Sequence, residues 1–96
     1  EEFKKREVIE RIIKKAIEIL MYTKLKNTGI EYEFRFRGVT LTINSYVNFY
    51  IDINLYELYF IKNYKDLEER ENEFAEIYSN FIMNYILKKW ESFILK

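Results

Sequence analysis

The sequence contains no cysteine, no histidine and no proline, and only two of its 96 residues are glycine. Without cysteine the chain can form neither disulfides nor thiolate metal sites. Without histidine it lacks the commonest general base and the commonest metal ligand, and it cannot form a Ser-His-Asp triad. Two isolated glycines do not make a glycine-rich phosphate-binding loop. We therefore expect a non-enzyme with no catalytic residue, no metal site, no cofactor and no small-molecule substrate.

Carboxylates remain as potential catalytic groups, and six of them cluster between positions 66 and 76. At helical spacing they spread around a solvated helix start, and no second acidic cluster faces them, so we interpret them as structural. Residues 1–29 carry eight basic and five acidic side chains, a net charge of +3. The alternative is that the acidic helix start meets a basic partner or imitates nucleic acid. The acidic residues are Asp66, Glu68, Glu69, Glu71, Glu73 and Glu76.

Neither charge nor hydropathy points to a membrane or to a polyanion. Sixteen basic residues balance sixteen acidic ones, so no global field attracts nucleic acid or an anionic bilayer. No apolar run approaches the ~20 residues that span a bilayer. The charged N-terminal stretch lacks the apolar core of a signal peptide. We expect an intracellular, cytoplasmic protein without a membrane partner.

The chain is rich in apolar and aromatic residues, at 49% and 19% respectively. That composition is typical of a globular protein, and large aromatic side chains suit a small core. A length of 96 residues lies near the commonest domain size. We therefore predict a single domain over residues 1–96.

Residues 3–28 show the apolar period of an amphipathic helix. Gly29 is predicted to end this helix in the left-handed conformation that glycine adopts readily. Charged residues occupy the opposite side of the helix. The predicted buried side comprises Val8, Ile9, Ile12, Ile13, Ala16, Ile17, Ile19 and Leu20.

Alternation of apolar and polar residues between positions 30 and 61 predicts an antiparallel β-meander. The alternation changes phase at Arg37-Gly38, which predicts a two-residue hairpin turn that pairs Phe36 with Val39 and Phe34 with Leu41. A β-bulge at Gly38 is the alternative. Beyond it, either one long bent strand runs from 39 to about 53, or a three-residue loop at 44–46 separates two strands.

The sequence then predicts a turn over residues 52–56 and a last strand over 57–61, which makes three or four strands in all. Asp66 is placed to be the N-cap of a helix that continues to the C-terminus, with a bend near Ser79-Asn80. The predicted fold class is therefore α+β: helix, antiparallel meander, helix, with both helices packed on one face of the sheet.

The outward face of the predicted sheet is the first candidate binding surface. Exposed tyrosines beside arginines can stack on bases, so a single-stranded nucleic-acid site is one interpretation. Glu31, Glu33 and Asp52 share that face, however, and an ordinary solvated sheet face is the preferred interpretation. The candidate residues are Arg35, Arg37, Tyr46, Tyr50 and Tyr59.

The last helix is the second candidate, because it carries two apolar stripes on opposite sides. One stripe can cover the sheet, and it comprises Leu67, Phe74, Ile77, Tyr78, Phe81 and Tyr85. The other stripe then packs against the first helix or forms an exposed protein interface, for which tryptophan and methionine are typical. The predicted interface comprises Met83, Ile86, Leu87, Trp90, Phe93 and Ile94.

These features together predict a small, non-enzymatic protein–protein interaction or regulatory module. Its partner would be a second copy, giving a homodimer, or another subunit of a larger assembly. Two alternatives remain open. The first is a module that binds single-stranded nucleic acid through the sheet face. The second is a compact viral inhibitor of a host defence enzyme, of the anti-CRISPR kind.

Overall fold

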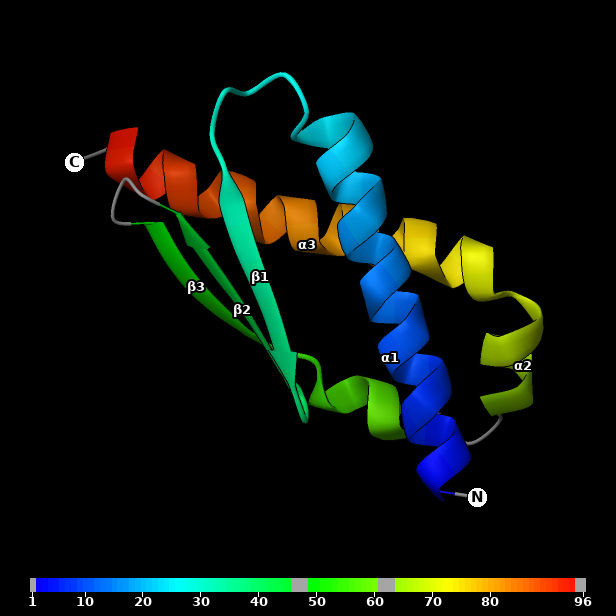
Figure 1. Cartoon of the computed structure of the whole chain (residues 1–96). Coiled ribbons are helices and arrows are strands. Elements are labelled where there is room, and N and C mark those ends of the chain that lie inside the picture. Colours follow the sequence, from blue (N-terminus) through cyan, green and yellow to red (C-terminus); the bar gives the residue numbers. More distant parts are fainter. Residues whose placement is uncertain (1, 46–48, 61–63, 95–96) are drawn as a thin grey trace.

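A computed structural model of the chain describes residues 2–45, 49–60 and 64–94, and within these ranges the side chains of Glu2, Tyr59, Phe60 and Ile94 are left out. The elements follow one another as a helix, a three-stranded antiparallel sheet and further helices (Figure 1). This arrangement confirms the predicted α+β fold class. The molecule is elongated, with principal extents of 45 × 22 × 19 Å.

Helix α1 (Glu2–Ile19) continues into a π-helical turn, η1 (Leu20–Lys24). The turn closes where the Leu25 N–H donates to the Leu20 carbonyl at 2.8 Å. The helix therefore ends about four residues earlier than predicted. Gly29 has the predicted left-handed backbone, with φ of +72°, but it lies in the following loop rather than directly after the helix.

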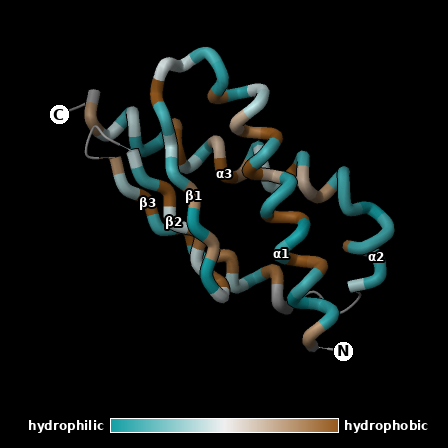
Figure 2. Tube along the Cα trace, in the orientation of Figure 1, coloured by the Kyte–Doolittle hydropathy of each residue, from teal (hydrophilic) through white to brown (hydrophobic). Residues whose placement is uncertain are grey.

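The predicted buried side of α1 is confirmed, except that Ile17 and Ile19 are only partly buried. Hydrophobic residues recur along α1 in bands (Figure 2). The fully buried positions are Val8, Ile9, Ile12, Ile13, Ala16 and Leu20.

Strands β1 (Tyr32–Arg37), β2 (Thr40–Ser45) and β3 (Phe49–Asn54) pair in the order β1-β2-β3. Phe36 pairs with Leu41, so the predicted hairpin register is wrong by two residues. The turn residues are Gly38 and Val39, and Gly38 has φ of +57°. Because tight hairpin turns require a positive φ at their first central residue, glycine rather than Arg37 takes that place. Both registers keep the apolar residues on one face.

Two separate strands, not one long strand, occupy residues 40–54, and the pairing of Ser45 with Phe49 brackets their connection. That connection, residues 46–48, lies outside the described ranges. The predicted turn at 52–56 is wrong in its first half, because Asp52 to Asn54 belong to β3.

The predicted fourth strand is instead a short 3₁₀ helix, η2 (Tyr56–Phe60). The Asn54 side-chain oxygen accepts a hydrogen bond from the Tyr56 N–H at 2.8 Å, which caps the turn. Leu55 and Leu58 are 3% and 2% exposed. Side chains three residues apart lie on one side of a 3₁₀ helix, so both leucines reach the core.

Helix α2 (Tyr64–Glu69) begins before Asp66, so Asp66 lies in the first turn and is not the N-cap. The long C-terminal helix is interrupted at Arg70, and α3 (Glu71–Ile94) then runs without a break through Ser79-Asn80. Figure 1 shows α2 turned away from the axis of α3. The interruption places Leu67 of α2, which is fully buried, against the core while α3 continues across the sheet.

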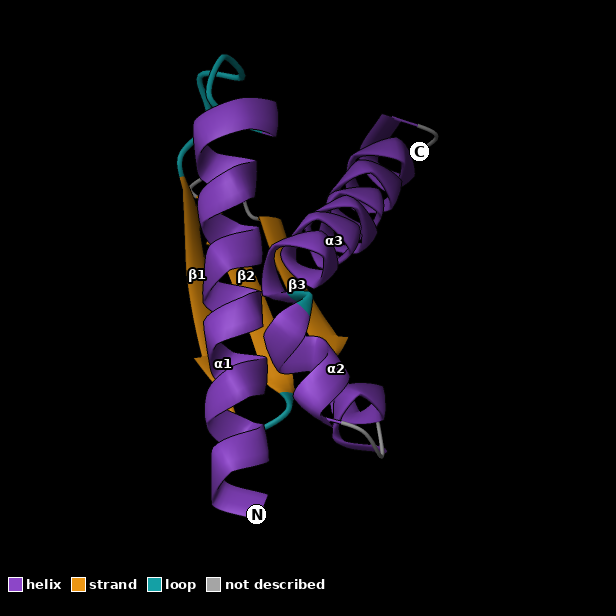
Figure 3. Cartoon of the chain, turned by 90° about the vertical axis from the view of Figure 1, so that its right-hand side faces the viewer, coloured by secondary structure: helices purple, strands orange, loops and turns teal. Residues whose placement is uncertain are grey.

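Helices α1 and α3 lie on one face of the sheet and pack against each other (Figure 3). The core-facing line of α3 is Ala75, Ser79, Ile82 and Ile86, each at most 1% exposed. By the ~100°-per-residue rule this line runs midway between the two predicted stripes. Small residues at 75 and 79 lie on the buried side of α3, and α3 packs closely against α1. No helix in the described ranges is long and apolar enough to cross a membrane.

Candidate functional site

The predicted interface on α3 is only partly at the surface. Ile86 is 1% exposed, so its inclusion is wrong. Met83 and Trp90 are half-buried against the core, whereas Leu87 and Phe93 are exposed at 47% and 41%. The Ile94 side chain lies outside the description. Whether any of these side chains contacts a partner stays a prediction.

Trp90 has structural neighbours on two strands. Its indole N–H donates to the Tyr32 hydroxyl at 2.9 Å, and its ring centroid lies 4.9 Å from that of Phe49. Tyr32 and Phe49 in turn meet edge to face at 5.5 Å. The ring of Phe93 lies 5.6 Å from Trp90 on the outer side. Trp90 therefore connects α3 to β1 and β3, and these contacts give it a structural role within the fold.

A different apolar line of α3 is exposed. Ile77, Phe81 and Tyr85 are 52%, 41% and 40% exposed, and their spacing of four residues places them along one side of the helix. The rings of Phe81 and Tyr85 are 5.2 Å apart. We call these three residues the α3 stripe. They belong to the set predicted to cover the sheet, and that prediction is wrong for them.

The α3 stripe is exposed because the helix turns its small residues inward. Figure 3 shows α1 and the sheet on one side of α3, with open space on the other. A line of small and medium residues, Ala75-Ser79-Ile82, would have indicated the packed side. The apolar periodicity did not identify this line, because small residues such as alanine and serine contribute little to it.

Charged residues flank the α3 stripe at both ends. On the N-terminal side, Arg70 bonds Glu73 at 2.7 Å and Asp66 at 3.5 Å. The hydrogen bond that Arg70 donates to the Glu73 carboxylate is the main cause that raises the pKa of Arg70. On the C-terminal side, Lys88 and Glu91 are exposed.

Most carboxylates of the acidic segment 66–76 are paired with basic side chains of the same molecule. Arg11 of α1 bonds Glu71 at 2.8 Å and lies 3.9 Å from Glu68, and Lys15 lies 3.5 Å from Glu71. The Arg11 hydrogen bond lowers the pKa of Glu71. With Arg70 bound to Asp66 and Glu73, four of the six carboxylates are paired. The charge asymmetry of the sequence thus supports α1 packing against α2 and α3.

The outward sheet face carries rings and guanidinium groups, and several of its polar groups are paired with one another. Tyr50 is 53% exposed, and its hydroxyl donates to Asp52 at 3.0 Å, which raises the pKa of Tyr50. Arg35 donates to Glu33 at 2.8 Å. Arg37 is exposed, and within the described ranges it has no ion pair.

The other two predicted members of this face are not placed there. Tyr46 lies outside the described residues. Tyr59 belongs to η2 rather than to a strand, and its side chain is not described.

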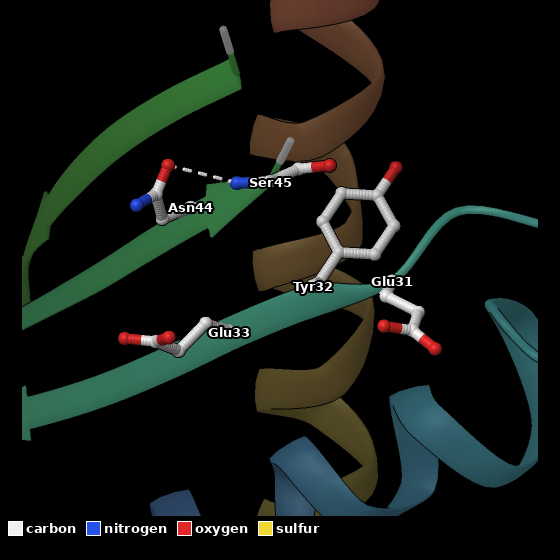
Figure 4. A pocket seen from close by; sticks show the side chains of 5 residues that line it. All are labelled: Glu31, Tyr32, Glu33, Asn44 and Ser45. Atoms are coloured by element: carbon white, nitrogen blue, oxygen red, sulfur yellow. Dashed lines mark hydrogen bonds between the residues drawn. The ribbon is translucent and has the colours of Figure 1, made fainter. Parts of the chain in front are cut away.

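Two hollows of about 360 Å³ each lie at the sheet, the first at one end of β1 and β2 and the second on the outward face. One is formed by residues at the start of β1 and the end of β2 (Figure 4). Its charged groups are the carboxylates of Glu31 and Glu33, which repel a phosphate. The second contains Arg35 and Arg37 beside Glu33 and Tyr50. The described part of the sheet face therefore offers stacking area, and of the two hollows the second carries the net positive charge.

No protein-family model, no curated protein and no solved structure matches the chain. Among the described residues, no group of three acidic side chains is arranged to hold a metal ion. The function therefore has to be argued from the chain's own surfaces.

Proposed function

We propose that this chain is a small, non-enzymatic interaction module that binds a protein partner through the α3 stripe. The observation that carries the proposal is the row of three large apolar side chains, each at least 40% exposed, on one side of a regular helix. Isolated exposed apolar residues are ordinary, but a contiguous line of an aliphatic and two aromatic side chains is typical of a protein interface.

Nucleic-acid binding through the sheet face is the second candidate, favoured by the exposure of Tyr50 and Arg37. It ranks below the first because Asp52 holds the Tyr50 hydroxyl and Glu33 holds Arg35. Affinity for single strands would fall steeply with salt and would require these side chains. A compact inhibitor of a defence enzyme would use the α3 stripe in the same way as any regulatory module, so the identity of the partner decides that alternative.

Capture from a lysate of the native host, with and without nuclease, tests the proposal. The baits are the wild-type chain, Phe81→Asp and, as a matched control, Tyr50→Ala. All three should show the same circular dichroism, since both positions are exposed. The proposal expects a discrete protein that the wild type and Tyr50→Ala retain and that Phe81→Asp loses, in both halves. Loss after nuclease, or loss with Tyr50→Ala alone, would move the function to the sheet face.

A further inference from the structure

Charged residues lie at both ends of the α3 stripe. When their order is read backwards, every positive charge meets a negative one. Along the helix the sequence of features is Arg70, Glu73, the α3 stripe, Lys88 and Glu91. The signs therefore run positive, negative, apolar, positive, negative. The described side chains of Arg70 and Glu73 are 46% and 64% exposed, and Lys88 and Glu91 are exposed as well.

All these residues lie on the same side of the helix. At ~100° per residue, Arg70 and Lys88 both project about 20° from the direction of Phe81, and Glu73 and Glu91 both project about 80° to the same side. Arg70 is the N-cap of α3, because its carbonyl accepts a hydrogen bond from the Phe74 N–H at 3.0 Å. The ~100° spacing of α3 therefore also gives the direction of Arg70.

We infer that the α3 stripe binds a second copy of this chain, with the two α3 helices antiparallel about a two-fold axis near Phe81. The inference rests on the proposed function and names its partner. The axis pairs Phe81 with its own copy and Ile77 with the second copy's Tyr85. At the ends it places Glu73 opposite the second copy's Lys88, and Arg70 opposite its Glu91.

Parallel association would give the opposite electrostatic result. Each charge would then face its own copy, and like charges across an interface are unfavourable. The intramolecular bond between Arg70 and Glu73 does not prevent the antiparallel arrangement, because exposed ion pairs exchange partners at little cost. A single pair of helices is a small interface, so we expect a dissociation constant on the order of micromolar.

Cysteine crosslinking tests the arrangement directly, because the chain has no cysteine of its own. Equal amounts of Ile77→Cys and Tyr85→Cys chains are mixed and oxidised. The two-fold axis brings 77 of one copy beside 85 of the other, whereas two copies of 77 are offset by ~12 Å along the helices, too far for a disulfide. Random pairing alone gives twice as much mixed disulfide as either homodisulfide, so the inference expects a ratio well above two, and a ratio of about two would contradict it. Predominance of a homodisulfide would overturn the inference.

A charge exchange gives an independent test by sedimentation equilibrium. Lys88→Glu should weaken the dimer by about two- to tenfold at physiological salt, and adding Glu73→Lys in the same chain should restore it. Within one chain the two positions are ~22 Å apart along the helix, beyond the screening length at physiological salt, so rescue requires a second copy. Absence of rescue would contradict the proposed pairing.

Failure of this inference is distinguishable from failure of the proposed function. A wild-type chain that stays monomeric at a concentration of several hundred micromolar overturns self-association. If Phe81→Asp nevertheless loses a captured protein in the lysate experiment, the α3 stripe is an interface for another protein. A dimer that Phe81→Asp leaves unchanged also overturns the inference, since the contact then lies elsewhere.

Discussion

Trp90 shows how one side chain can look like an interface residue and yet hold the fold together. It is the only tryptophan of the chain, and it joins α3 to both outer strands through Tyr32 and Phe49. A tryptophan near a chain's end, beside Met83 and Phe93, is typical of a binding patch. Its partner Tyr32 lies 58 positions away in the sequence. No local pattern reveals such a contact.

We predict that Trp90→Ala lowers the free energy of unfolding by about 2–3 kcal/mol, through the loss of its ring contacts and its hydrogen bond. Trp90→Phe retains ring packing against Phe49 and should cost about 1 kcal/mol. Leu87→Ala, on the exposed side of the same helix, is the control and should change stability by under about 0.5 kcal/mol. Urea unfolding followed by circular dichroism measures all three. An unchanged Trp90→Ala variant would mean that the indole is free for a partner.

A second residue-scale prediction concerns Glu71, whose pKa is lowered mainly by its hydrogen bond with Arg11. Because the folded pKa lies below the unfolded one, the carboxylate stabilises the fold above the usual glutamate range, about pH 4.3, and this contribution is lost as the pH falls through the folded value. Arg11 is half exposed, so the gain is about 0.5–1 kcal/mol.

The measurement compares wild type with Glu71→Gln in urea titrations between about pH 3 and pH 7. The stability difference should be present at neutral pH and should vanish at the acidic end. Glu69→Gln, which alters an exposed carboxylate of α2, is the matched control. A difference that stays constant with pH would show that packing, not charge, accounts for it.

At the scale of elements, periodicity predicted most of the architecture correctly. The apolar face of α1 and the alternation along β1 each have a single partner surface, so the pattern alone identifies the buried side. The hairpin register failed by two residues because pattern fixes only the face, while the turn is set by the positive φ of Gly38. The prediction of a strand over residues 57–61 was wrong for the described residues of that range, because a short apolar run does not by itself distinguish a strand from a helical turn.

Helix α3 carries apolar residues around most of its circumference. Such a helix has no clear amphipathic side, and the neighbours decide which line is buried. Ala75 and Ser79 form that line, since they let α3 cross close to α1. The buried line therefore lies between the two predicted stripes, and the α3 stripe is exposed together with Leu87 and Phe93 of the predicted interface.

The crossing of α1 and α3 leads to a prediction for Ser79, which is fully buried. Its hydroxyl donates to the Glu76 carbonyl at 2.7 Å within the same helix and accepts a long hydrogen bond, of 3.4 Å, from the Lys24 ammonium. Ser79→Ala should therefore be nearly neutral, whereas Ser79→Leu forces the helices apart and should cost about 1–3 kcal/mol. Asn84→Leu makes a comparable change at an exposed position of α3 and should be tolerated. Thermal melts of the three variants separate these outcomes, and a stable Ser79→Leu would mean that the helices do not cross there.

At the scale of the whole molecule, two features of the sequence turn out to complement each other. The basic first helix and the acidic segment 66–76 come together through Arg11 and Lys15, so that their charge excesses offset each other. An interpretation of either segment alone as a binding site overlooks the ion pairs between them. The apolar core likewise joins segments that are far apart in the sequence, because it includes residues from both long helices, the sheet, η2 and α2.

This shared core predicts that residues 1–96 unfold as one cooperative unit. Trp90 lies towards one end of α3, ~28 Å along the helix from Glu71 and the contacts with Arg11. Tryptophan fluorescence therefore reports the end where α3 meets the sheet, whereas far-ultraviolet circular dichroism reports all the helices. If the core is single, urea transitions followed by the two signals share one midpoint and one slope. An earlier fluorescence midpoint would mean that the sheet separates from the helices first, and residues 1–96 would then not behave as a single domain.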